Sequence, residues 1–127
     1  MIYYFSSKTG NTKRFVDKLS DFESYRIENN NNILVAKNKF VLFVATYANG
    51  EGKNAIPKHV INFIKNNKDN LLGVISSGNK NFGAMYGISG DIISRNCNIP
   101  LLYKYELFGT ENDVANVNEI LKGIINV

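Results

Sequence analysis

Two long apolar runs, FVLFVAT at 40–46 and LLGVISSG at 71–78, constrain the fold more than any other feature of this sequence. A strand with one face in water alternates apolar and polar residues, whereas the first run is apolar at nearly every position. Such a run is typical of a central parallel strand that is buried on both faces. Covering both faces requires helices on either side of the sheet, so we expect an α/β fold.

Strand-like and helix-like segments alternate along the chain, which supports this interpretation. The remaining strands or short extended segments are expected at 1–5, 25–28, 32–37 and 100–107. Four segments are expected to be helices from the spacing of their apolar residues: 14–22, 56–67, 85–96 and 112–124. The alternation predicts a doubly wound parallel sheet of five strands with helices on both faces.

Length and composition limit the possible functions. A chain of 127 residues with 44% hydrophobic content fits one domain spanning 1–127. No stretch is long and apolar enough for a membrane span, and the N-terminus lacks a secretory signal, so we expect a cytoplasmic protein without a membrane partner. The single Cys97 has no Cys or His neighbour and is expected to be a partly buried residue rather than a metal ligand.

The formal net charge of +4 raises the possibility of a nucleic-acid partner. The lysines are scattered, however, and the sequence contains no basic run or nucleic-acid-binding motif. We therefore expect no nucleic acid among the partners. His59 is expected to be a surface or boundary residue of a helix, away from the binding site.

Three polar loops that contain glycine follow the first, third and fourth strands: SSKTGNT at 6–12, TYANGEG at 46–52 and SSGNKNFG at 76–83. In doubly wound sheets, ligands bind beyond the carboxyl ends of the strands, at the point where the strand order reverses. We therefore expect the three loops to share one binding site.

The first loop joins a strand to a helix and combines small polar side chains with Gly10. Backbone N–H groups and the positive end of the helix dipole suit a phosphate at such a junction, and glycine permits a tight turn there. An ordinary N-cap by Asn11 or Thr12 is the simpler alternative, although a cap needs only one such residue. Neither the Walker loop nor the dinucleotide fingerprint is present, and the ends of the first and third strands carry no carboxylates for magnesium. The expected ligand is a monophosphate held without a metal.

A family resemblance is carried by these loops together with ELFGTENDV at 106–114. The segment SSKTGNTKRF resembles the FMN phosphate loop of flavodoxins. The combination with the later segments resembles the NrdI family, small flavodoxin-like partners of class Ib ribonucleotide reductase. The resemblance runs from Ile2 to about Val117, and it implies a flavodoxin-like fold with FMN as the cofactor.

The resemblance also implies FMN-binding residues in all three loops. Those of the phosphate loop are Ser6, Ser7, Thr9, Gly10, Asn11 and Thr12. Those of the loop beside the flavin ring are Thr46, Tyr47, Asn49 and Gly50. Those on the other side of the ring are Ser77, Gly78, Asn79, Asn81, Phe82 and Gly83. Tyr47 and Phe82 are expected to stack on the ring, and the peptide between Asn49 and Gly50 is expected to reorient on reduction.

The function implied by the resemblance is activation of the reductase. Reduced FMN would give an electron to molecular oxygen, and the resulting superoxide or related oxidant would pass to the dimanganese site of the small subunit, NrdF. There it would support formation of the tyrosyl radical needed for deoxyribonucleotide synthesis. An unidentified reductant would feed the flavin. The chain would be an accessory redox flavoprotein with neither a catalytic side chain nor a metal ligand of its own, rather than a stand-alone enzyme. Lys8, Lys53 and Lys80 in the flavin-side loops are expected to ease the second reduction.

Three alternatives remain at this point. A general flavodoxin electron carrier would share the same FMN site but serve another partner. A flavin-free signalling receiver would need an aspartate cluster at the strand ends, which the sequence lacks. A nucleic-acid-binding module would bind oligonucleotides with a steep salt dependence.

Overall fold

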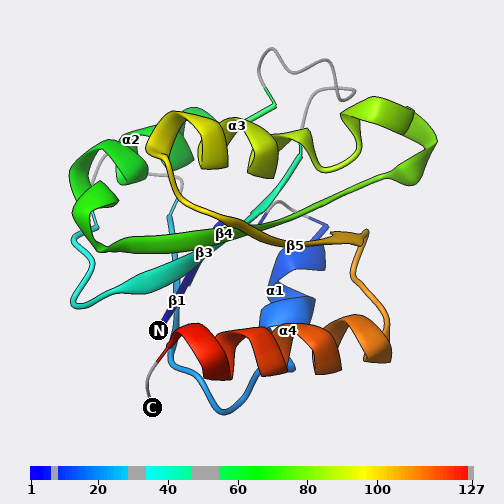
Figure 1. The fold of residues 1–127 in the computed structure, drawn as a ribbon, viewed down its shortest axis with the longest axis horizontal. Helices are drawn as coiled ribbons and strands as arrows, with labels where there is room; N and C mark the ends of the chain where they lie inside the picture. Colours follow the sequence, from blue (N-terminus) through cyan, green and yellow to red (C-terminus); the bar gives the residue numbers. More distant parts are fainter. Residues whose placement is uncertain (7–8, 29–33, 47–54, 126–127) are drawn as a thin grey trace.

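The computed structural model describes residues 1–6, 9–28, 34–46 and 55–125, which form one five-stranded sheet with helices on both sides (Figure 1). The strands are β1 (Ile2–Tyr4), β2 (Ser24–Arg26), β3 (Phe40–Ala45), β4 (Leu71–Gly78) and β5 (Leu101–Glu106). Their order is β2-β1-β3-β4-β5, and every neighbouring pair is parallel. The predicted doubly wound sheet is therefore confirmed, and its strand order reverses between β1 and β3.

The helices lie in two layers. They are α1 (Asn11–Asp17), α2 (Lys58–Asn67), α3 (Ile88–Cys97) and α4 (Glu111–Ile124), with short 3-10 helices η2 (Lys68–Asn70) and η3 (Lys80–Met85). In Figure 1, α2 and α3 lie on one side of the sheet and α1 and α4 on the other. Among the helices of the described residues, none combines the length and apolar character needed to cross a membrane.

Alternate residues of the central strands belong to two separate hydrophobic cores. On β3, Phe40, Leu42 and Val44 pack in the core that includes residues of α2 and α3. Val41 and Phe43 pack in the other core, together with residues of α1 and α4. All five side chains are at most 1% exposed. This two-sided burial confirms the interpretation of the apolar run at 40–46.

Several predicted boundaries differ from the structure. The helix expected at 14–22 ends at Asp17. The chain then forms tighter turns, in which the Leu19 N–H donates to the Val16 carbonyl and the Phe22 N–H donates to the Leu19 carbonyl. Leu19 and Phe22 are nevertheless buried in the core, as their spacing predicted. The helix expected at 56–67 begins at Lys58, because Pro57 is an extended N-cap.

The prediction of a continuous helix over 85–96 was also wrong at its start. Met85 ends η3, and Gly87 has a left-handed backbone (φ 63°), so α3 begins only at Ile88. The extended segment expected at 32–37 forms no strand over its described residues, 34–37. There the Ala36 N–H donates to the side chain of Asn67 at 2.7 Å instead of to a neighbouring strand. The asparagines at 29–32 lie outside the described residues.

His59 and Cys97 are boundary residues, as expected. The His59 ring stacks on Phe5 with ring centres 6.4 Å apart, and its side chain is half-buried in α2. Cys97 is half-buried at the end of α3, and burial raises the pKa of its thiol. Neither position has the exposed, activated character of a nucleophile.

The start of α3 lies unusually close to β4. The Ser76 hydroxyl of β4 donates to the Gly87 carbonyl at 2.9 Å. A side chain at Gly90 would overlap the Ser76 hydroxyl and come within 2.7 Å of Leu101. Only glycine fits at position 90 without displacing these neighbours.

A capping box begins α4. Thr110 accepts a hydrogen bond from the Asp113 N–H at 3.1 Å, and Asp113 accepts one from the Thr110 N–H at 2.8 Å. The Tyr103 hydroxyl also donates to Asp113, at 2.7 Å. Burial by itself raises the pKa of Asp113, but these hydrogen bonds and the nearby Lys80 outweigh it and lower the pKa below its ordinary value of 3.8.

Replacing Gly90 tests the close approach of α3 to β4. We expect Gly90→Ala to lower the free energy of unfolding by about 1–3 kcal/mol, because the added methyl group overpacks the contact with Ser76. Gly123→Ala in α4 is the matched control: its new methyl group meets no atom within 4 Å, so it should stabilise by about 0.5–1 kcal/mol. Urea unfolding measures both. A Gly90→Ala protein as stable as wild type would contradict the packing described here.

The capping box predicts a pH-dependent contribution to stability. Because the native pKa of Asp113 is lowered, its contribution is complete above pH 3.8 and is lost as the pH falls through the native value. We expect Asp113→Asn to cost about 1 kcal/mol at pH 7 and progressively less below pH 4. Urea unfolding of both proteins between pH 7 and pH 3 measures this difference. A constant difference across that range would disprove the linkage.

Candidate functional site

The loops after β1, β3 and β4 leave the sheet at the same edge. Tyr4 of β1 pairs in register with Phe43 of β3, and Ala45 pairs with Ser77 of β4. Because the three strands are parallel, their carboxyl ends and the loops that follow lie side by side. As predicted, the loops begin together at the reversal of strand order between β1 and β3, and that they share one binding site stays a prediction.

The loop after β1 is held by a buried serine and turned by a glycine. The Ser6 side chain is 4% exposed, and its hydroxyl accepts from the Lys13 N–H at 3.3 Å. Its carbonyl accepts from the Arg26 guanidinium at 3.0 Å. Gly10 has a left-handed backbone (φ 73°) and is the N-cap of α1. Ser6 therefore ties the loop to both α1 and β2, while Gly10 makes the turn into the helix.

The alternative in which Asn11 or Thr12 is an ordinary N-cap was wrong. Both residues lie inside α1, one and two positions after the glycine N-cap. Asn11 is half-buried, and its side-chain oxygen accepts from Arg14 at 3.5 Å. Thr12 is 2% exposed, and Thr9 is exposed. Apart from Ser6, whose hydroxyl accepts from the Lys13 N–H in the first turn of α1, capping therefore does not explain the small polar side chains described in this loop.

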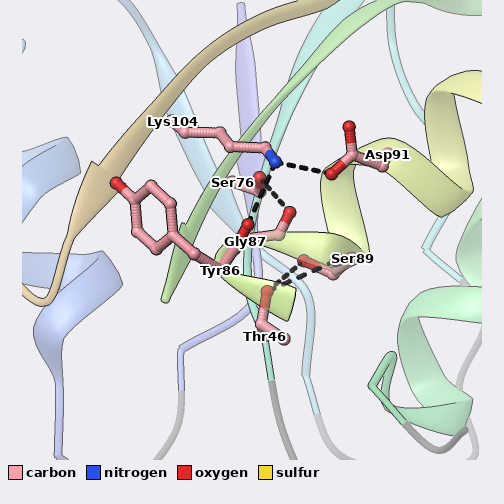
Figure 2. Close-up of polar contacts among 7 residues, drawn as sticks. All are labelled: Thr46, Ser76, Tyr86, Gly87, Ser89, Asp91 and Lys104. Carbon is pink, nitrogen blue, oxygen red and sulfur yellow. Dashed lines mark hydrogen bonds and ion pairs between the residues drawn. The ribbon is translucent and has the colours of Figure 1, made fainter. Parts of the chain in front are cut away.

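The loop after β3 is described only at its start and end. The Thr46 N–H donates to the Ser77 carbonyl at 2.9 Å, which continues the pairing of β3 with β4. The Thr46 hydroxyl lies 3.0 Å from the hydroxyl of Ser89 and accepts from the Ser89 N–H at 3.3 Å (Figure 2). This contact joins the loop after β3 to the first turn of α3. The predicted residues Tyr47, Asn49 and Gly50 lie outside the described residues, as do Ser7, Lys8 and Lys53.

The loop after β4 contains the other predicted site residues. Ser77 is 3% exposed and Gly78 is half-buried, both still within β4. The Asn79 side chain accepts from the Asn81 N–H at 2.9 Å and so begins η3. Gly83 interrupts η3 with a left-handed φ of 56°. The backbone of Phe82 belongs to η3, and its predicted stacking on a flavin ring stays a prediction.

Residues of β5 that the sequence interpretation missed hold the same loop. The Lys104 ammonium donates to the Tyr86 carbonyl at 3.0 Å and forms an ion pair with Asp91 at 2.5 Å (Figure 2). The Glu106 carboxylate accepts from the Lys80 N–H at 3.1 Å. Two charged residues at alternate positions of an otherwise apolar and aromatic strand, LLYKYE, are the sequence signal that could have revealed them.

A groove of about 640 Å³ lies beside this loop. Its described lining comes from η3, Tyr86, β5, the turn after β5 and the start of α4, and includes Lys80, Glu106, Phe108 and Asp113. Burial raises the pKa of the Tyr86 hydroxyl, and the carboxylates of Asp113 and Glu106 add to the effect. None of the predicted FMN-binding residues is among the described residues that line it. Lys80, which does line it, belongs to the predicted flavin-side loop, so the groove adjoins that loop.

The described residues fit a phosphate-bearing flavin. A Cβ added at Gly10 or at Gly83 would meet no atom within 4 Å, so both loops leave open space above a glycine. The first turn of an α-helix presents N–H groups that lack partners within the helix, and the donors nearby are hydroxyl and amide groups. Within the described part of the chain, no group of three or more His, Cys, Asp or Glu side chains is placed to hold a metal ion. These hydrogen-bond donors are uncharged groups that can bind an anion such as phosphate.

Comparison with known proteins decides the family. The family model described as NrdI Flavodoxin like matches residues 2–119. The chain belongs to the NrdI family. It is 45% identical over 119 residues to Protein NrdI of Rhizobium leguminosarum bv. trifolii (strain WSM2304), covering 92% of this chain and 89% of that protein. It is 47% identical over 125 residues to Protein NrdI of Mycoplasma pneumoniae (strain ATCC 29342 / M129 / Subtype 1), covering 94% of this chain and 81% of that protein.

Solved structures show the same fold for this NrdI-family chain. A short-chain flavodoxin associated with a non-canonical PDU bacterial microcompartment matches with a TM-score of 0.67 at 17% identity, covering 98% of this chain and 94% of that one. Oxidised flavodoxin 2 from Bacillus cereus matches with a TM-score of 0.57 at 18% identity, covering 93% and 92%. At such low identity these matches establish the flavodoxin-like fold alone.

Gly10 provides a test of the geometry of the first loop. We expect Gly10→Ala to lower the free energy of unfolding by about 1–2 kcal/mol, because a left-handed backbone is unfavourable for a residue with a Cβ. Gly10→Asn should cost less, since asparagine tolerates this conformation better than alanine. Denaturant unfolding compares the three proteins. Equal stability of all three would show that position 10 is not left-handed.

Proposed function

We propose that this chain binds FMN at the loops after β1, β3 and β4 and, as a single cytoplasmic domain over 1–127, activates class Ib ribonucleotide reductase through the small subunit NrdF. The observation that carries the proposal is that the polar loops of an NrdI-family chain leave the sheet together at the reversal between β1 and β3. Doubly wound sheets bind their ligands at this position.

Each loop has a distinct part in the proposal. The first turn of α1, with the side chains of Thr9, Asn11 and Thr12, would bind the phosphate. Thr46 and the residues after it would line one side of the ring. Gly78, with the loop after it, would line the other side. Ser6 accepts from the Lys13 N–H and Ser77 from the Thr46 N–H, and we propose that both contribute by fixing the backbone of the loops around the cofactor.

The chemistry supplied by bound FMN in its reduced form is electron transfer to molecular oxygen, which yields the superoxide or related oxidant required by NrdF. The chain's own residues would bind the phosphate and orient the ring. The exposed Lys80 of η3 adds positive charge near the proposed ring site, which favours an anionic bound state. Its effect should weaken as salt is added.

The phosphate-binding role of the first loop predicts a specific loss of affinity. We expect Thr12→Val to weaken FMN binding about 10-fold or more, because a hydroxyl hydrogen bond to a charged group is lost while the side-chain shape is kept. Thr12→Ser keeps the hydroxyl and should bind as wild type does. Quenching of FMN fluorescence during titration of the apo-protein measures the dissociation constants. Equal affinity of the valine and serine variants for FMN would show that the Thr12 hydroxyl does not bind the phosphate.

Activation itself requires the partner. We expect wild-type protein loaded with FMN, reduced anaerobically and then exposed to oxygen, to generate a tyrosyl radical in manganese-loaded NrdF, measured by electron paramagnetic resonance. FMN-free protein is the control. Reversible reduction without radical formation would favour the general electron carrier over the activator. Absence of FMN binding would overturn the flavoprotein assignment.

A further inference from the structure

The loop between β4 and α3 is held at both ends by side chains of the neighbouring strand β5. Near its start, the Lys80 N–H donates to the Glu106 carboxylate at 3.1 Å. At its end, the Lys104 ammonium donates to the Tyr86 carbonyl at 3.0 Å. Residues two apart on a strand point to the same side, so Lys104 and Glu106 reach the loop from one face of β5.

The Lys104 end is the more strongly held of the two. Besides the Tyr86 carbonyl, the ammonium binds the Asp91 carboxylate of α3 at 2.5 Å (Figure 2). The two charged side chains are 26% and 33% exposed, so water screens them less than it screens a surface pair. The ammonium also lies 5.8 Å from the centre of the Tyr86 ring. One side chain of β5 thus fixes the last residues of the loop and the first turn of α3 together.

Two further contacts hold the loop near its ends. The Leu107 N–H donates to the Gly78 carbonyl at 3.0 Å, and the Ser76 hydroxyl holds the Gly87 carbonyl at 2.9 Å. Between these points, the left-handed Gly83 breaks the 3-10 helix. The side chains of Lys104 and Glu106 therefore supply contacts that the β4–β5 pairing itself does not.

The geometry points to Lys104 and Glu106 as positioning residues that form a clamp on the flavin-side loop, residues 79–87. The inference rests on the proposed function, in which this loop lies beside the flavin ring. A loop already held in its bound conformation loses less conformational freedom on binding, so the clamp raises affinity without touching the cofactor. The residues of the loop that are proposed to contact the flavin, among them Asn79 and Gly83, would then depend on β5 for their positions.

The experiment compares variants that remove each contact with variants that keep it. Lys104→Met removes the ammonium but keeps most of the side-chain length, and Lys104→Arg keeps the charge. Glu106→Leu removes the acceptor, and Glu106→Gln keeps a carbonyl acceptor. Lys122→Met is the matched control, because it breaks the exposed Lys122–Glu119 pair of α4, which has an N–O distance of 3.7 Å. Amide hydrogen exchange of the FMN-free protein and the FMN dissociation constant are the two measurements.

We expect Lys104→Met to speed amide exchange across 79–87 and to weaken FMN binding, each about 10-fold, since the lost hydrogen bonds involve a charged group. Glu106→Leu should have a smaller effect of about threefold, because its contact is exposed. Lys104→Arg, Glu106→Gln and Lys122→Met should stay near wild type. Exchange in β1 and α4 should not change in the Lys104 and Glu106 variants, which separates local loosening of the loop from global destabilisation.

The outcomes separate this inference from the proposed function. Wild-type loop exchange and affinity in both Lys104→Met and Glu106→Leu would overturn the clamp while leaving FMN binding intact. Faster loop exchange with unchanged FMN affinity would show that the clamp does not serve the flavin, and would also overturn the inference. Failure of the wild-type protein itself to bind FMN would instead overturn the proposed function, whatever the exchange rates of the variants.

Discussion

From Phe40 to Val44, neither face of β3 reaches water, because alternate side chains of this strand pack against helices on opposite sides of the sheet. Helices must therefore follow the strands on both sides, and each connection returns the chain to begin the next strand in the same direction. Parallel strands bring their carboxyl ends to one edge. The loops that follow β1, β3 and β4 consequently meet at that edge, and the position of the candidate site is a result of how the core is buried.

The start of α3 links two of these loops. Thr46 contacts Ser89 in the first turn of α3, while Ser76 and Lys104 hold the two residues that precede the helix. The close approach at Gly90 brings this end of the helix down onto β4. Loops on both sides of the proposed flavin ring thus both contact the beginning of α3.

The fold and the family of this chain rest on different comparisons. The flavodoxins of known structure share less than a fifth of their residues with this chain, and their similarity describes the arrangement of strands and helices. Such an arrangement serves many activities. The NrdI relatives, at about 45% identity over nearly the whole chain, define the family. The proposed chemistry depends on the loops, and the structure explains how their described hydroxyl, amide and backbone groups are brought together at one edge.

The sequence by itself determined the strands and cores that depend on local pattern. The run at 71–78 became β4 with the expected bounds, and Leu19 and Phe22 reached the core although α1 ends before them. The sequence also revealed the polar loops, because residues with hydroxyl groups and glycines follow the apolar runs of the buried strands. The apolar spacing wrongly predicted a helix that runs through Gly87. This residue has a left-handed backbone, which a right-handed helix cannot include.

The tertiary structure alone decided which side chains support the site. Lys104 meets Asp91 across 13 positions of the chain, and Glu106 meets the backbone of Lys80 across 26. No local spacing encodes such pairs, since they exist only because the parallel pairing of β4 with β5 sets the register between distant segments. Composition and periodicity determine whether each segment forms a strand, a helix or a loop. Packing between segments determines the partners of each polar group, because hydrogen bonds require contact within about 3 Å.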